Sequence, residues 1–176
     1  MVLFELRDER AVAPLVGGAE LRPLPDLDDD GCADFAWCFG YRDAAGAQRG
    51  RCVVASSRSG ASLGRIEVED LGAGFGAVAA GRSHAGSDAI VCIGCFGGDG
   101  GPGRVFVHDA RSGRRLSVVT RADASPSFGE GLVLVAQDPG EWRLFVGDPG
   151  ALDATSAAVG CVSGFSLRRS ACVQRR

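Results

Sequence analysis

The chain repeats itself at an interval of slightly more than fifty residues, and this repeat constrains its fold more than any other feature. Residues 34–60 (DFAWCFGYRDAAGAQRGRCVVASSRSG) align with residues 88–113 (DAIVCIGCFGGDGGPGRVFVHDARSG), and a third copy follows at 141–170. The alignment puts Gly40, Gly94 and Gly147 at one repeat position. A unit of this size cannot bury both of its faces alone, so the repeat predicts an array in which neighbouring units share a core.

Each unit has the pattern of four short strands. The expected strands are 76–81 and 131–136 (first), 89–94 and 143–147 (second), 50–57 and 103–110 (third), and 64–71 and 115–120 (fourth). Residues 65–69 (RIEVE) alternate between charged and apolar side chains, as in a strand with one buried face. The 27 glycines favour tight turns between strands over long helices. The sequence therefore predicts an all-β protein.

Four strands per repeat indicate a β-propeller-like array of three four-stranded blades. We expect a single domain over residues 1–176, with units at about 13–71, 72–124 and 125–176. Residues 4–9 (FELRDE) resemble the fourth strand of a unit and are a candidate for a strand that closes the array. Because closed propellers usually have about four to eight blades, three units leave three options: an open array, a fragment, or completion by oligomerisation.

The stretch DLDDDGCADF at 26–35 is the strongest candidate for a binding site. Ca²⁺ takes six to eight oxygen ligands, and a short loop can wrap the ion when alternate side chains point inward and a glycine permits a sharp turn. Gly31 provides that turn. The expected ligands are the carboxylates of Asp26, Asp28, Asp30 and Asp34 and the backbone carbonyl of Cys32. A solvated acidic turn without an ion is the alternative.

This loop is not of the EF-hand type, because Trp37 stands where that motif needs a bidentate glutamate and the flanking segments are not helical. Mg²⁺ suits the loop less well than Ca²⁺, since it resists dehydration and seldom binds in a cage made only of protein ligands.

Three features together resemble the FG-GAP repeat family, the integrin-alpha-like or VCBS-type propellers. They are the Phe-Gly pairs at 75–76 and 128–129, the D-x-D-x-D-G-x-x-D loop at 26–34, and the apolar strand that ends in glycine after it. The resemblance implies a propeller fold, calcium in the first unit only, an adhesion-type role and an extracellular location. WD-repeat propellers are a weaker resemblance, because the chain has no Trp-Asp or Gly-His pair.

The cysteines and histidines give weaker signals. Seven cysteines cannot all pair within one chain, and Cys92 and Cys95 form a C-x-x-C with no second pair at zinc spacing. Cys38, Cys92 and Phe145 share one repeat position, so we expect an apolar side chain there and not a ligand. A Ser-His-Asp triad using His84 or His108 is an alternative, but no G-x-S-x-G pattern accompanies it.

Composition limits the kinds of partner that the chain is expected to bind. The net charge of −3 gives no basic surplus for nucleic acid, and no apolar run is long enough to insert into a membrane. The charged N-terminal residues 5–10 are unlike the apolar core of a secretory signal.

We expect a non-catalytic, calcium-stabilised scaffold that binds a protein or a glycan, with a homo-oligomer among the options. A fragment of a propeller-bearing hydrolase or lyase is one alternative. A lectin that uses Trp37 or Trp142 to stack on sugar is the other.

Overall fold

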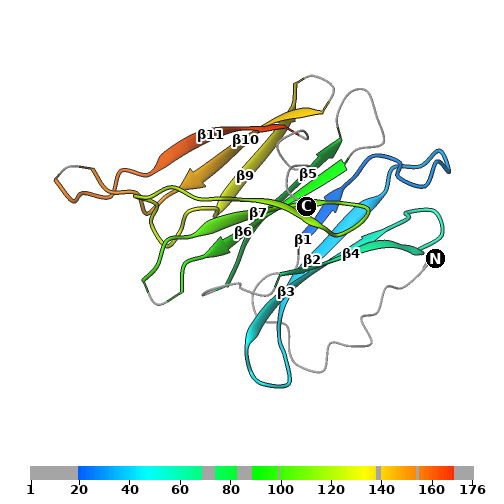
Figure 1. Cartoon of the computed structure of the whole chain (residues 1–176), viewed down its shortest axis with the longest axis horizontal. Coiled ribbons are helices and arrows are strands. Elements are labelled where there is room, and N and C mark those ends of the chain that lie inside the picture. The colour runs from blue at the N-terminus through cyan, green and yellow to red at the C-terminus, as the bar shows by residue number, and fades with distance from the viewer. Residues whose placement is uncertain are drawn as a thin grey trace, which may run out of the picture.

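The computed structural model describes residues 20–68, 74–82, 89–98, 100–137, 140–153 and 155–168. These residues form eleven β-strands and no helix, so the prediction of an all-β fold is confirmed. The strands belong to three separate antiparallel sheets (Figure 1). The candidate closing strand at 4–9 and the last residues of the third unit lie outside the described residues.

Each sheet is built from strands that follow one another in the chain. The first sheet contains β1 (Glu20–Pro23), β2 (Phe35–Arg42), β3 (Gln48–Ala55) and β4 (Ser62–Val68) in that order. The second contains β5 (Gly74–Arg82), β6 (Ala89–Phe96), β7 (Arg104–Asp109) and β8 (Arg115–Val119), again in order. The third contains β9 (Gly131–Ala136), β10 (Glu141–Asp148) and β11 (Cys161–Arg168), with β10 in the centre. Within each sheet, every strand thus pairs with a strand that neighbours it in sequence.

Two hydrophobic cores hold the three sheets together. One core joins the first and second sheets and includes Ile66 of β4 and Val91 of β6. The other joins the second and third sheets and includes Cys92 of β6 and Leu144 of β10. Because successive residues of a strand point to opposite faces, β6 contributes to both cores. The second sheet therefore lies between the other two, and both of its faces are covered (Figure 1).

The repeat positions of the sequence keep the same orientation in all three sheets. Cys38 of β2 is buried against the second sheet, and Cys92 of β6 is buried against the third. We call the face that carries this repeat position the front face of each sheet, and the opposite face its back face. On the front face of the third sheet the equivalent residue, Phe145, is 37% exposed.

The Phe-Gly pair at 128–129 marks a close contact between the second and third sheets. Phe128 is fully buried in the second core, and its ring meets Phe165 edge to face at 6.2 Å. Gly129 has a left-handed φ of 97°, which glycine adopts without strain. Its backbone lies directly against Gly94 of β6, so that a side chain at Gly94 would overlap the Gly129 carbonyl. The motif thus has a packing role here.

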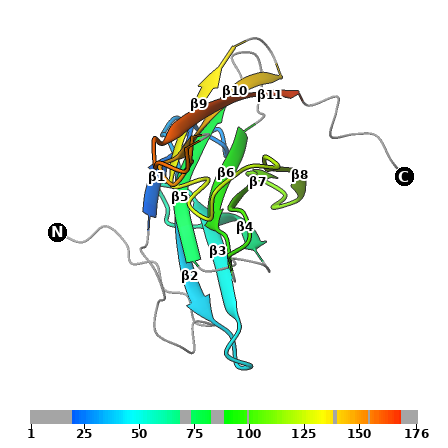
Figure 2. The same ribbon diagram turned by 90° about the vertical axis from the view of Figure 1, so that its left-hand side faces the viewer.

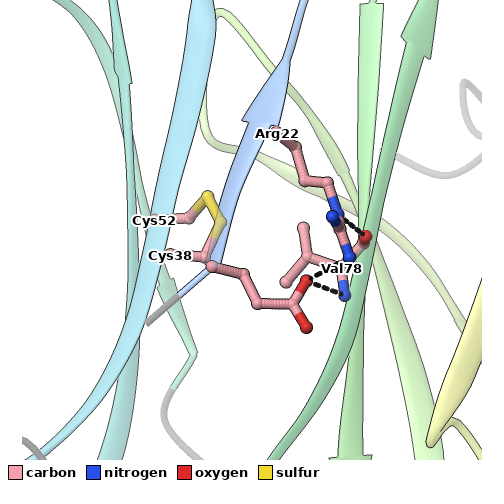
Figure 3. The surroundings of a disulfide bond; sticks show 5 residues. Arg22, Cys38, Cys52 and Val78 are labelled. Carbon is pink, nitrogen blue, oxygen red and sulfur yellow. Dashed lines mark hydrogen bonds and ion pairs between the residues drawn. A yellow bond between two sulfur atoms is a disulfide. The ribbon is translucent and has the colours of Figure 1, made fainter. Parts of the chain in front are cut away.

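The first strands of the sheets contact one another. β1 contacts β5, and β5 contacts β9, as Figure 2 also shows. The register of β5 shifts between Phe75 and Val78, and the backbone of Val78 forms hydrogen bonds with side chains of β1. Arg22 donates from Nε to the Val78 carbonyl at 2.7 Å, and the Val78 amide donates to Glu20 at 3.1 Å (Figure 3).

A disulfide joins Cys38 of β2 to Cys52 of β3 within the first sheet (Figure 3). The two residues lie directly opposite each other in the antiparallel register, and both are fully buried. No feature of the sequence indicated this pair, because the repeat position of Cys38 is otherwise apolar. Cys92 and Cys95 are both buried, and burial raises the pKa of Cys92 to about 12. They behave as small apolar side chains, not as a reactive pair.

Candidate metal centre

The acidic loop connects β1 to β2 and is anchored from below by two leucines. Leu24 and Leu27 are buried in the core between the first and second sheets. The Leu24 amide donates to the Asp34 carbonyl at 2.7 Å, and the Leu27 amide donates to the Asp34 carboxylate at 2.6 Å. The apolar positions of the loop thus hold it down, and its carboxylates lie above them.

Asp26 shapes the turn of this loop. Its two carboxylate oxygens accept hydrogen bonds from the Asp30 amide at 3.2 Å and the Gly31 amide at 2.8 Å. Asp29 and Gly31 both take left-handed backbone conformations, with φ of 61° and 86°, as aspartate and glycine tolerate best. The hydrogen bond from Gly31 lowers the pKa of Asp26, so this carboxylate is ionised near neutral pH.

Three of the predicted ligands come together. Asp26, Asp28 and Asp34 each place a carboxylate oxygen within 4.8 Å of the other two. Two oxygens bound to one Ca²⁺ lie at most about 5 Å apart, because each ligand distance is about 2.3–2.6 Å. These separations are compatible with all three carboxylates binding one metal ion.

Asp34 is the buried member of this group, and its electrostatics favour a cation. Burial raises its pKa, two backbone amides lower it, and the negative charges of Asp28 and Asp26 raise it further. When the pKa of a carboxyl is higher in the folded than in the unfolded protein, the free energy of unfolding falls as the pH rises through that pKa. The folded loop thus bears an unfavourable negative charge at neutral pH, which a bound cation would neutralise.

The other two predicted ligands have different contacts. The Asp30 carboxylate accepts from the Cys32 amide at 2.8 Å and from the Ser56 hydroxyl at 3.4 Å, and it is not one of the three clustered carboxylates. The three clustered groups are carboxylates, and the role of the Cys32 carbonyl as a metal ligand stays a prediction. In this structure Asp30 ties the loop to the turn after β3.

Three arginines also hold the loop, and the sequence pattern gave no indication of them. Arg58, in the turn after β3, donates to the Asp30 carbonyl at 2.8 Å. Arg82 of β5 donates to the Asp26 carbonyl at 3.2 Å, and Arg111, in the turn after β7, donates to the Leu27 carbonyl. Two of these arginines belong to the second sheet. The loop therefore links the first sheet to the second, in addition to their shared hydrophobic core.

The other residues that sequence analysis singled out have structural surroundings. His84 lies outside the described residues. His108 is buried in β7, where its Nδ1 lies 3.0 Å from the Gly113 carbonyl; its Nε2 has no partner among the described residues. Trp142 is only 3% exposed and packs between the second and third sheets, so it is not available to stack on a sugar. Trp37 is half-buried on the back face of the first sheet.

His108 predicts a pH dependence of stability. Burial lowers its pKa below the usual 6.5, so the folded protein holds it neutral while the unfolded chain takes up a proton first. Between about pH 7.5 and pH 5.5 the free energy of unfolding should fall, by at most about 1.4 kcal/mol per pH unit. Urea unfolding of the wild type and of His108→Gln measures this slope. Equal slopes for the two proteins would contradict the assignment.

Among the described residues no helix is long and apolar enough to span a membrane. Comparisons of the chain with protein-family models, with curated proteins and with solved structures found no match, so the resemblance to the FG-GAP repeat family remains a prediction from the motifs.

Proposed function

We propose that the protein is a non-catalytic β-propeller-type scaffold whose first unit is stabilised by calcium and which binds a protein or a glycan. The observation that carries the proposal is the loop at 26–34, where three carboxylates converge above a turn held by both the first and second sheets. The hydrogen bonds that Asp26 and Asp34 accept from backbone amides order the loop. A fixed loop of this kind keeps the structure rigid, as a scaffold requires.

The propeller arrangement rests on the repetition of the sheets. Three antiparallel sheets follow one another in the chain, and the first strands β1, β5 and β9 are neighbours, as blades around a common axis would have them. The third sheet has three strands among the described residues, and a cleft of about 360 Å³ separates β8 from β11. Leu116 and Val119 line it on one side, and Phe165 and Leu167 on the other. A fourth strand added to β11 would fill this cleft, and residues 4–9 are the candidate.

In this proposal Asp26, Asp28 and Asp34 bind calcium, with Asp30 and the Cys32 carbonyl as the further oxygen donors predicted from the sequence. The ion would supply positive charge against three carboxylates that otherwise repel one another. The chain's own part is to place these carboxylates, through the amides of Leu27, Asp30 and Gly31. Binding would stabilise the loop, and with it the contact between the first two sheets.

Calcium is therefore expected to raise the melting temperature. A ligand present at a hundred times its dissociation constant adds about 2.7 kcal/mol to the free energy of unfolding. For a chain of this size that corresponds to a rise of about 5–10 °C. Differential scanning calorimetry with millimolar CaCl₂, and with EDTA, measures the difference.

The variants Asp26→Asn, Asp28→Asn and Asp43→Asn separate a specific site from a general effect of salt. Asp28 is exposed, so Asp28→Asn should remove most of the calcium effect while leaving the metal-free melting temperature unchanged or slightly higher. Asp26→Asn should remove most of the calcium effect and also lower the metal-free melting temperature, because Asp26 also holds the turn. Asp43, in the β2–β3 turn, is the matched control. A melting temperature that is the same with calcium and with EDTA would overturn the calcium part of the proposal.

A further inference from the structure

Strand β11 forms the outer edge of the third sheet (Figure 1). It pairs with β10 on one side, and its other side pairs with no strand among the described residues. In the first and second sheets a fourth strand lies at this position, where β4 pairs with β3 and β8 pairs with β7. An unpaired edge presents backbone amides and carbonyls to any segment that can pair with them. The described part of the third sheet thus has the form of a blade without its last strand.

The cleft beside this edge, between β8 and β11, has an apolar interior. Val107 and Leu116 line it on the side of the second sheet, and Phe165 and Leu167 line it on the side of the third. Phe165 and Leu167 are alternate residues of β11, so their side chains share one face, and both pack against the core between the two sheets. A segment that pairs with the outer side of β11 must therefore place apolar side chains on that same face.

Trp142 supplies a second, independent observation. It lines the same cleft and is only 3% exposed. Its indole Nε1 is buried and has no hydrogen-bond partner among the described residues. A buried indole N–H usually finds an acceptor. A polar group on an occupant of the cleft would supply that acceptor.

Residues 4–9 (FELRDE), which lie outside the described residues, have the pattern that this position requires. In an extended chain Phe4 and Leu6 point to one side. Glu5 and Arg7 then point to the other. The last four residues of β4, the fourth strand of the first sheet, alternate in the same way between exposed charged and buried apolar side chains. The apolar side of residues 4–9 would face the second sheet, and the charged side would face water.

The charges around the cleft are also complementary to this segment. Arg168 is already paired with Glu141 at 2.8 Å, and the Asp109 carboxylate accepts two hydrogen bonds within its own turn. Arg114, which also lines the cleft, forms no ion pair among the described residues. Residues 4–9 carry three acidic side chains and one arginine. An acidic segment beside Arg114 is therefore favoured over a basic one.

We propose that residues 4–9 form the fourth strand of the third sheet within the same chain, antiparallel to β11, with Phe4 and Leu6 inserted in the cleft. The strand completes the third sheet in the way that β4 and β8 complete the other two. It covers the free edge of β11 and buries the apolar walls of the cleft, and both effects stabilise the contact between the second and third sheets. The inference rests on the blade arrangement proposed above.

Residues 10–19 are long enough to join this strand to β1. The contacts of β1 with β5 and of β5 with β9 span about 20 Å, and the strand spacings from β9 to a strand beyond β11 span about 14 Å. The straight distance is therefore about 25 Å, whereas ten extended residues reach about 33–36 Å. The segment can thus reach the open edge without a second copy of the chain.

Amide hydrogen exchange along Cys161–Arg168, followed by NMR, tests the proposal. Alternate amides of an antiparallel strand point to opposite neighbours, so one set points to β10 and the other to the outer edge. Both sets should be protected in the wild type. Phe4→Asp should raise the exchange rates of the outer set by about tenfold or more, because a carboxylate is not tolerated in the apolar cleft and an unpaired edge opens to water.

Leu3→Asp is the matched control. It makes the same substitution one residue earlier, on the side expected to face water, so the outer amides should stay protected. Leu6→Asp repeats the test on the apolar side and should behave as Phe4→Asp does. The amides that point to β10 should stay protected in all three variants, which shows that the third sheet remains folded.

Fast exchange of the outer amides in the wild type would overturn the proposal. Protection that survives both Phe4→Asp and Leu6→Asp would also overturn it, because another segment would then occupy the edge. If protection disappeared on dilution while light scattering showed a dimer dissociating, the strand would come from a second copy, and the assignment to the same chain would be wrong.

The calcium titration is independent of this outcome. A calcium-stabilised protein with an unprotected outer edge would refute only the added strand. A protected edge in a protein indifferent to calcium would refute only the metal site.

Discussion

Replacing Gly94 by alanine is expected to lower the free energy of unfolding by about 3 kcal/mol or more, the upper part of the range for an overpacked site. The added methyl group would overlap the Gly129 carbonyl oxygen and lie only 2.9 Å from its carbonyl carbon. Both neighbours are backbone atoms in a buried contact, so neither can move aside as a flexible side chain could. The melting temperature should fall by about 6–12 °C, measured by calorimetry.

Gly131→Ala is the matched control. Gly131 lies at the start of β9, two residues beyond Gly129, and a methyl group there would meet nothing within 4 Å. Its replacement should change the free energy of unfolding by less than about 0.5 kcal/mol, as is usual for surface substitutions. Equal effects of the two substitutions would show that the close approach of β6 to the Phe-Gly turn is not what limits the size of residue 94.

The second large effect is expected for Phe128→Ala, at about 3–5 kcal/mol. Phe128 is fully buried in the core between the second and third sheets, so its removal takes away apolar contacts and leaves a cavity. Chemical denaturation in urea should show a lower midpoint with an unchanged slope. Phe128→Leu keeps most of the volume and should cost much less. An alanine variant as stable as the wild type would mean that this core collapses around the missing ring.

The sequence repeat was sufficient to predict the kind of fold, because it rests on positions that the structure uses directly. The expected strands at 76–81, 89–94, 131–136 and 143–147 lie within β5, β6, β9 and β10. The three glycines at 40, 94 and 147 occupy central strands of three sheets. Repetition at this period indicates neighbouring sheets because a single sheet of this size leaves one face in water.

The acidic loop could be predicted only in part. The alternation of Asp26 and Asp28 around a glycine turn is a local property, and these two residues come together with Asp34. The place of Asp30 depends on Ser56, which is distant in sequence and close in space. The arginines from β5 and from the turn after β7 are likewise distant from the loop in sequence and close to it in space. Contacts between segments this far apart leave no local pattern, and the Cys38–Cys52 pair is a further example.

The two-sided burial of the second sheet bears on how such an array could lengthen by duplication. A unit inserted beside β6 would have to match two existing cores at once, because neighbouring residues of that strand pack against different sheets. A unit added beyond the third sheet would meet only the front face of that sheet, where Phe145 is 37% exposed. The molecule can thus gain a unit at its outer sheet without changing any side chain of its interior.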